Sequence, residues 1–169
     1  LIVVLSVMNG FTKEVRGRML SVLSHVEVSS PGGGLPDWTA VATAARGHPE
    51  VEAAAPYLAA QAMLARGDAV RGALVRGIDP VLEPTVSGAV RQLLAGSLDR
   101  LVDGEFNIVL GSELARALDA RIGEKVTLIA PQGSVTPAGV VPRLRQFTVV
   151  GYVESGHFEF DSALALVHL

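Results

Sequence analysis

Three side chains near the end of the sequence have the types and spacing of a metal site. His157, Glu159 and Asp161 alternate with Phe158 and Phe160. If residues 157–161 form a β-strand, the three polar groups share one face, and imidazole and carboxylate groups are ligands that divalent metals accept. The same alternating pattern is also typical of a strand that buries its phenylalanines and exposes its polar side chains to water. We prefer this second interpretation, with a metal-dependent hydrolase as the alternative.

Other catalytic patterns are absent from the sequence. His25, His48 and His168 are scattered and have no ligand partner at a suitable spacing. There is no cysteine, no nucleophile elbow and no phosphate-binding glycine loop. We therefore expect the chain to have no catalytic residue, no metal and no cofactor.

A second feature is a proline-rich arm at residues 130–146. Pro131, Pro137 and Pro142 interrupt a β-branched stretch, so the strand that starts near Val126 must leave its sheet and return around Phe147. Proline fixes φ and lacks an N–H donor, which makes the arm stiff and poorly suited to pairing with itself. The sequence predicts an extended hairpin that another protein can contact.

The base of the arm carries positive charge. Arg143 and Arg145 lie there, and residues 126–153 contain no Asp or Glu. Two guanidinium groups can pair with carboxylates on the rim of a partner and favour its encounter and register. The alternative is a structural hairpin folded over the domain's own core.

Composition limits the classes of function. The chain has 169 residues, a formal net charge of −3 and 5% aromatic residues. A nucleic-acid surface normally needs an excess of Lys and Arg, so no nucleic-acid partner is expected. The length suffices for one domain or two small lobes with a core of their own. Without cysteine there can be no disulfide framework.

Hydrophobic periodicity and turn signals predict an α+β fold. Asp37 is placed to cap a helix at residues 38–46, and Arg66-Gly67-Asp68 to connect a hairpin of residues 51–65 and 69–78. That triplet also spells an integrin-binding motif, but a polar hairpin tip is the preferred interpretation. Ser112 is predicted to cap a helix with Leu114, Leu118 and Ile122 on one face. The other predicted elements are a helix at 9–24, a strand at 25–29, a loosely helical region at 81–95, and strands at 106–110 and 126–129.

Both ends of the sequence are apolar. Residues 1–5 form a run far shorter than the ~20 residues that cross a bilayer, and residues 162–169 are similar. We expect a loop excised from between two membrane spans, in which residues 1–8 are the end of a transmembrane helix. An ordinary fragment with an apolar first strand is the alternative.

Several short motifs, taken in order, resemble one family. The matching stretches are residues 6–11 (Ser-Val-Met-Asn-Gly-Phe), 76–80 (Arg-Gly-Ile-Asp-Pro), 104–111 and 123–128. Each is modest alone, but their order and spacing are similar to the extracytoplasmic domain of the lipoprotein-releasing ABC transporter permeases of the LolC/LolE family, within the MacB/FtsX-type superfamily. The resemblance covers nearly the whole chain.

This resemblance implies a periplasmic domain between the first two spans of a bacterial inner-membrane permease. It implies two lobes: a porter-like mixed α/β lobe from residues 1–59 and 102–169, and an inserted lobe from residues 60–101. ATP hydrolysis is expected on a separate nucleotide-binding subunit of the LolD type. Further implied partners are a second permease subunit, either LolE-like or a second copy, and the lipoprotein client.

In the LolC-like members of the family, a protruding hook and a nearby polar patch recruit the periplasmic lipoprotein chaperone LolA. Residues 131–142 are similar to that hook, and Arg145 matches an arginine of the patch, whereas Leu144 departs from the expected polar residue. The same fold with another client is the alternative. The partner-binding residues that the resemblance and the arm together imply are Pro131, Val135, Thr136, Pro137, Gly139, Val140, Val141, Pro142, Arg143, Arg145 and Gln146.

Overall fold

The computed structural model of the protein describes residues 26–30, 34–91, 93–136 and 139–169. Within residues 131–142 it is the backbone that is described. The predicted helix at 9–24 and the predicted end of a membrane span at 1–8 lie outside these ranges, as does Pro137. Among the described helices, none is long and apolar enough to cross a membrane.

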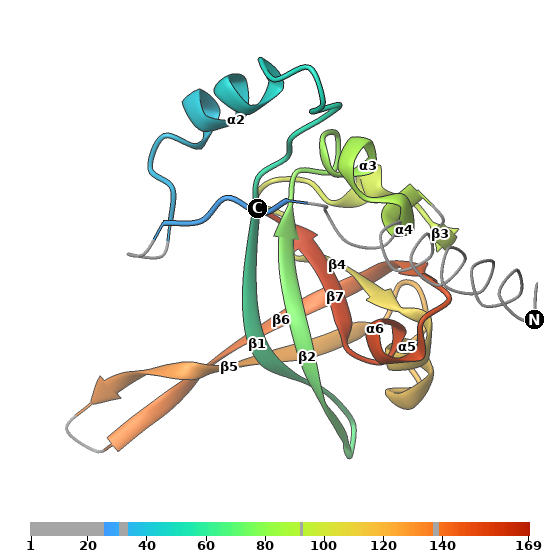
Figure 1. The fold of residues 1–169 in the computed structure, drawn as a ribbon. Coiled ribbons are helices and arrows are strands. Elements are labelled where there is room, and N and C mark those ends of the chain that lie inside the picture. Colours follow the sequence, from blue (N-terminus) through green and yellow to red (C-terminus); the bar gives the residue numbers. More distant parts are fainter. Residues whose placement is uncertain (1–25, 31–33, 92, 137–138) are drawn as a thin grey trace, which may run out of the picture.

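Seven strands within the described ranges form one sheet in the order β3-β6-β4-β7-β2-β1-β5. Because β5 also pairs with β6, every strand except β3 belongs to a closed ring. The strands are β1 (Tyr57–Arg66), β2 (Ala69–Ile78), β3 (Leu93–Gly96), β4 (Asn107–Gly111), β5 (Lys125–Thr136), β6 (Gly139–Val153) and β7 (Leu164–His168). Figure 1 shows β1 and β2 at the front of the view, with β4 to β7 behind them.

Short helices surround this ring. They are α2 (Trp38–Arg46), α3 (Glu83–Val86), α4 (Gly88–Arg91), the 3₁₀ helix η1 (Leu98–Arg100), α5 (Ser112–Ala117) and α6 (Phe158–Asp161). In Figure 1, α2 stands away from the ring at the upper left, while α5 and α6 lie beside β7. The predicted mixture of helices and strands is confirmed, and the structure adds that a sheet dominates it.

The strands alternate between two apolar cores, because successive side chains of a strand point to opposite faces. Ile108 and Leu110 of β4 join a cluster inside the ring, where they meet Leu114 and Leu118 of the α5 region. The residue between them, Val109, faces outward into a second cluster. This outer cluster also contains Ile78, Val90, Leu98, Leu101, Val150, Val153 and Leu166.

Several predicted elements are confirmed. The Asp37 carboxylate accepts a hydrogen bond from the Ala40 N–H at 3.1 Å, and α2 has the predicted bounds. The β1–β2 hairpin closes on the pair Arg66 and Ala69 with Gly67 at φ +55°, a value that glycine adopts without strain. Its first strand begins at Tyr57, however, and not at residue 51.

Other predictions were wrong. Residues 26–29 form no strand. The region 81–95 is helical only in part, as α3 and α4, because the backbone at Ser87 is extended and residues 93–95 belong to β3. Gly111 occupies the N-cap position of α5 without a side-chain cap, and Ser112 is a buried first residue whose hydroxyl makes no hydrogen bond. Ile122 lies beyond the end of α5 and is 39% exposed.

The predicted division into two lobes stays a prediction. Strands β1, β2 and β3 come largely from the range 60–101 and hydrogen-bond within the same sheet as β4 to β7. The range 60–101 therefore shares a hydrogen-bonded sheet with residues 102–169.

Candidate functional site

The two longest of the described strands, β5 and β6, form an antiparallel hairpin that contains the arm. Their pairing runs from Lys125 opposite Thr148 to Thr136 opposite Gly139. A register shift between Ala130 and Ser134 places extra β5 residues opposite β6. Figure 1 shows that the outer half of the hairpin projects beyond the other strands, at the lower left of the view.

The point at which the arm leaves the ring is consistent with the position of Pro131. β1 pairs with β5 at Met63–Ile129, Leu64–Leu128 and Ala65–Thr127, and no further pair follows in the described residues. Continuing this register would place Pro131 opposite Gln61. Proline has no N–H to donate, so the ladder cannot continue through that position.

The two arginines at the base of the arm lie on the same side of β6. Arg143, Arg145 and Phe147 alternate along the strand, and Phe147 packs against the interior cluster. The Arg145 guanidinium carbon lies 4.4 Å from the centre of the Phe106 ring, a cation–π contact. Phe106 in turn meets Phe147 edge to face, with ring centres 5.7 Å apart. The aromatic pair thus holds Arg145 while both arginines remain exposed.

The other predicted patch residue points elsewhere. Gln146 and Leu144 occupy the alternate positions of β6, so they face the outer side of the sheet, opposite to the arginines. Leu144 is 61% exposed and lies opposite Ile129, which pairs with Met63 of β1. Gln146 is therefore not part of one surface with Arg143 and Arg145. For the predicted residues within 131–142, the structure gives backbone pairing alone, and Pro137 lies outside the described residues.

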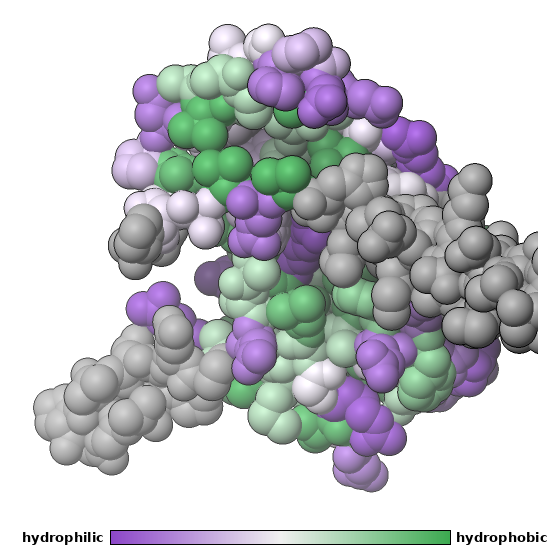
Figure 2. Space-filling model, viewed as in Figure 1, coloured by the Kyte–Doolittle hydropathy of each residue, from purple (hydrophilic) through white to green (hydrophobic). Residues whose placement is uncertain are grey.

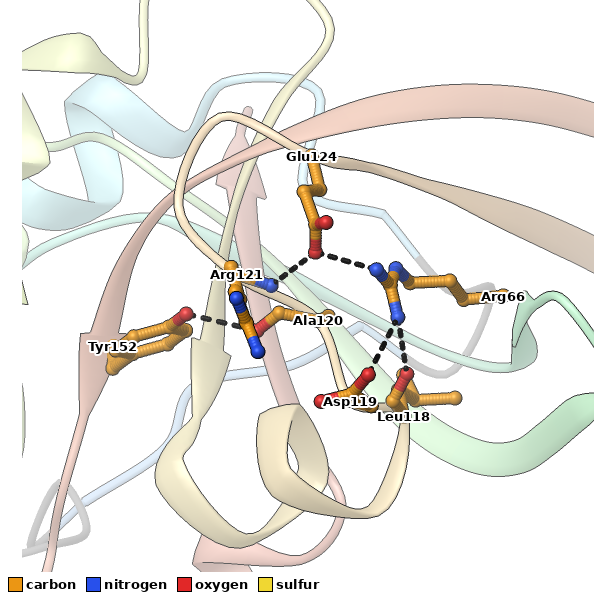
Figure 3. Close-up of polar contacts among 7 residues, drawn as sticks. All are labelled: Arg66, Leu118, Asp119, Ala120, Arg121, Glu124 and Tyr152. Atoms are coloured by element: carbon orange, nitrogen blue, oxygen red, sulfur yellow. Dashed lines mark hydrogen bonds and ion pairs between the residues drawn. The ribbon is translucent and has the colours of Figure 1, made fainter.

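A polar network anchors the hairpin where β5 begins (Figure 3). Arg66, at the end of β1, binds the Glu124 carboxylate at 2.7 Å and the Leu118 carbonyl oxygen at 3.3 Å. The same Glu124 oxygen accepts a hydrogen bond from the Arg121 N–H at 2.7 Å. The Tyr152 hydroxyl of β6 donates to the Ala120 carbonyl at 2.8 Å. These bonds join the β1–β2 hairpin, the loop after α5 and the two strands of the arm.

The network also explains the Arg66-Gly67-Asp68 triplet. Because Arg66 is engaged by Glu124, Asp119 and a backbone carbonyl, its guanidinium is part of the fold. The polar hairpin tip is the interpretation that this geometry supports. Sequence reasoning missed this role of Arg66, and also missed Phe106 as the support of Arg145, because both depend on contacts between distant segments.

Glu124 makes the network sensitive to acid. The Arg121 backbone N–H, followed by the Arg66 side chain, lowers the pKa of Glu124 below its ordinary value. A lowered carboxyl pKa in the folded state contributes stability above the unfolded pKa, which is lost as the pH falls through the folded pKa. We expect Glu124→Gln to reduce the loss of thermal stability between pH 7 and pH 3, as measured by circular dichroism. Equal losses in the wild type and the variant would contradict this prediction.

The candidate metal trio does not form a site. Residues 158–161 are the helix α6, so the predicted strand at 157–161 is wrong, and the alternation of its residues does not place them on one face. Asp161 is buried and accepts hydrogen bonds from the Ser155 N–H and Oγ, each at 2.8 Å. The preferred interpretation predicted that Phe158 is buried, but this side chain is 70% exposed. In the described part of the chain, no three His, Asp or Glu side chains are grouped to hold a metal.

Comparison with known proteins places the chain in one protein family. It matches the MacB-like periplasmic core domain over residues 1–168. It is 48% identical over 169 residues to the lipoprotein-releasing system transmembrane protein LolC of Neisseria meningitidis, and 41% identical over 169 residues to LolC of Xylella fastidiosa. All of this chain and 41% of each relative are covered, so the chain spans about two fifths of their length.

One solved structure is also partly similar to the chain. The periplasmic region of MacB from Actinobacillus actinomycetemcomitans is 16% identical, with a TM-score of 0.49. The similarity covers 85% of this chain and 56% of that one.

Proposed function

The chain belongs to the family of MacB-like periplasmic core domains, and from this membership we propose that it is the periplasmic domain of a LolC-type lipoprotein-releasing permease of the bacterial inner membrane. In this proposal, the domain docks a soluble periplasmic lipoprotein chaperone of the LolA type through the β5–β6 arm. The whole permease would work with a second permease subunit, a separate nucleotide-binding subunit and the lipoprotein client.

The observation that carries the docking proposal is the geometry of the arm. Beyond Ile129, β5 is paired to β6 and not to β1, and Figure 1 shows this part reaching away from the ring. A hairpin built in advance loses less conformational entropy on binding than a free loop would. Prolines at positions 131 and 142 restrict its backbone further.

Charge at the base of the arm supports the same proposal. Arg143 and Arg145 are exposed and share one side of β6, so they can contact carboxylates on the rim of a carrier whose cavity receives the arm. Such rim contacts act mainly on encounter rate and register. Stacking on Phe106 fixes the position of Arg145 before the carrier arrives.

A charge reversal tests this arrangement. We expect Arg143→Glu/Arg145→Glu to weaken binding of the purified chaperone by about tenfold or more, since two favourable rim contacts become repulsive. The matched control is Arg71→Glu/Arg100→Glu, which makes the same change in net charge on exposed arginines outside the β5–β6 hairpin and its anchoring network. Biolayer interferometry at two salt concentrations measures the affinity of each double variant for the chaperone. The docking proposal fails if the wild type does not bind, or if the two double variants are weakened equally.

A further inference from the structure

The direction of the backbone groups in β1 can be worked out from its neighbours. On β2, the Leu74 N–H donates to Ala163 at 2.7 Å, and the Ile78 carbonyl accepts from Leu169 at 3.0 Å, both on the β7 side. The direction of the backbone N–H and C=O groups alternates along a strand, so these groups of Val75 and Gly77 point toward β1. Their partners Ala60 and Leu58 therefore point toward β2.

It follows that Ala59 and Gln61 direct their N–H and C=O groups away from β2. On that side, β5 pairs with β1 at Met63, Leu64 and Ala65, and no described strand pairs with Ala59 or Gln61. Both residues are exposed. In Figure 1, the upper half of β1 has β2 on one side and no strand on the other.

This free edge lacks the usual protection against strand pairing. Natural edge strands carry Lys, Pro, bulges or inward charges that discourage another strand from adding. Residues 57–62 read Tyr-Leu-Ala-Ala-Gln-Ala and contain neither charge nor proline. The small side chains of Ala59 and Ala60 leave room for a neighbouring backbone, and Leu58 offers an apolar contact that is 63% exposed. Figure 2 shows mainly pale to mid green along the middle of the view, where β1 and β2 run.

We propose that the β1 edge at Ala59 and Gln61 binds an extended segment of the soluble carrier by β-strand addition. This inference rests on the proposed function and adds a second contact to it. The edge becomes free at the place where the arm diverges from β1, so a carrier that holds the arm lies next to it. Main-chain hydrogen bonds on the edge and side-chain contacts on the arm then fix the carrier at two places.

The arm itself is poorly suited to accept such a strand. The β5 edge that is no longer paired with β1 begins at Pro131, which has no N–H to donate. The β1 edge has a donor and an acceptor at both Ala59 and Gln61. The added segment is therefore expected to pair with β1 and to be uncharged where it passes Leu58 and Ala60.

Amide hydrogen exchange by NMR tests the proposal residue by residue. In the free protein, the Ala60 and Ala62 amides face β2, so we expect them to exchange slowly, and we expect those of Ala59 and Gln61 to exchange fast. On addition of the purified chaperone, we expect the Ala59 and Gln61 amides to slow by about tenfold or more. Ala60 and Ala62 serve as internal controls within the same strand.

The possible outcomes separate this inference from the proposed function. If the chaperone binds and changes the arm signals while Ala59 and Gln61 remain fast, strand addition is wrong and docking through the arm stands. If the chaperone does not bind, both strand addition and docking through the arm are wrong. If Ala59 and Gln61 slow with rising protein concentration and without chaperone, the edge pairs with a second copy and the inference is overturned.

A pair of proline variants gives an independent readout. Ala59→Pro removes a donor that faces the open side, so the fold is retained and chaperone affinity falls by about tenfold. Ala60→Pro removes a donor of the β2 ladder, so it lowers the melting temperature. Unchanged affinity in a folded Ala59→Pro variant would contradict strand addition.

Discussion

Replacing residues 131–142 by Asn-Gly is expected to abolish chaperone binding, with at least a hundredfold loss of affinity, and to leave the domain folded. The new ends, Ala130 and Arg143, are direct partners in the register of β5 and β6. The backbone N–H and C=O groups of Ile129 point toward β1, so those of Ala130 point toward β6. Ala130 and Arg143 are therefore a hydrogen-bonded pair, like Arg66 and Ala69 at the β1–β2 turn. Asn-Gly is the preferred two-residue turn for such a pair.

The fold should survive because the arm lies outside the apolar cores. Among the described residues, neither cluster contains a β5 residue beyond Leu128 or a β6 residue before Phe147. We expect a melting temperature within a few degrees of the wild type. Isothermal titration with the chaperone measures the affinity, and circular dichroism measures the melting. Retained binding by this folded variant would show that the carrier recognises another surface.

The second large effect concerns stability. Arg76→Ala is expected to destabilise the domain by about 3 kcal/mol at pH 7, because it leaves a buried carboxylate without its partner. Glu83 is 1% exposed, and its oxygen lies 3.2 Å from the Arg76 guanidinium. That guanidinium also stacks on the Tyr57 ring at 4.1 Å from its centre, so the substitution removes packing as well. Urea unfolding measures the loss.

A pH series distinguishes the lost charge partner from the lost packing. Burial raises the pKa of Glu83, and Arg76 opposes this rise. A raised carboxyl pKa gives stability below the unfolded pKa that is lost as the pH rises through the folded pKa. In Arg76→Ala the positive charge that opposes this shift is absent, so the pKa of Glu83 is raised further. The variant therefore loses more stability than the wild type as the pH rises. The difference from wild type should therefore shrink below the ordinary pKa of glutamate, where the carboxyl is neutral in both states.

Two variants serve as controls for the buried pair. Arg76→Met/Glu83→Leu replaces both charges by apolar groups and is expected to recover much of the stability. Glu83→Gln removes the titrating group and should flatten the pH dependence between the ordinary and the raised pKa. A loss in Arg76→Ala that is the same at all pH values would show that packing alone was removed.

The sequence by itself determined the local features. Asp37 and Gly67 act through neighbours a few residues away, so the cap of α2 and the β1–β2 turn could be predicted from their letters. The missing N–H of Pro131 is likewise a property of one residue. The position where the arm departs from the ring is consistent with it.

Tertiary structure decided what depends on distant partners. Alternation at residues 157–161 suggested a strand, but the segment folds as α6, which packs against α5 and β4. Which side of β6 carries Arg143 and Arg145, and which carries Gln146, was decided by the packing of Phe147 against the interior cluster. The free backbone of Ala59 depends on where β5 stops pairing. Short-range periodicity is written in the chain, whereas register, ring closure and burial arise from contacts between segments that are far apart in sequence.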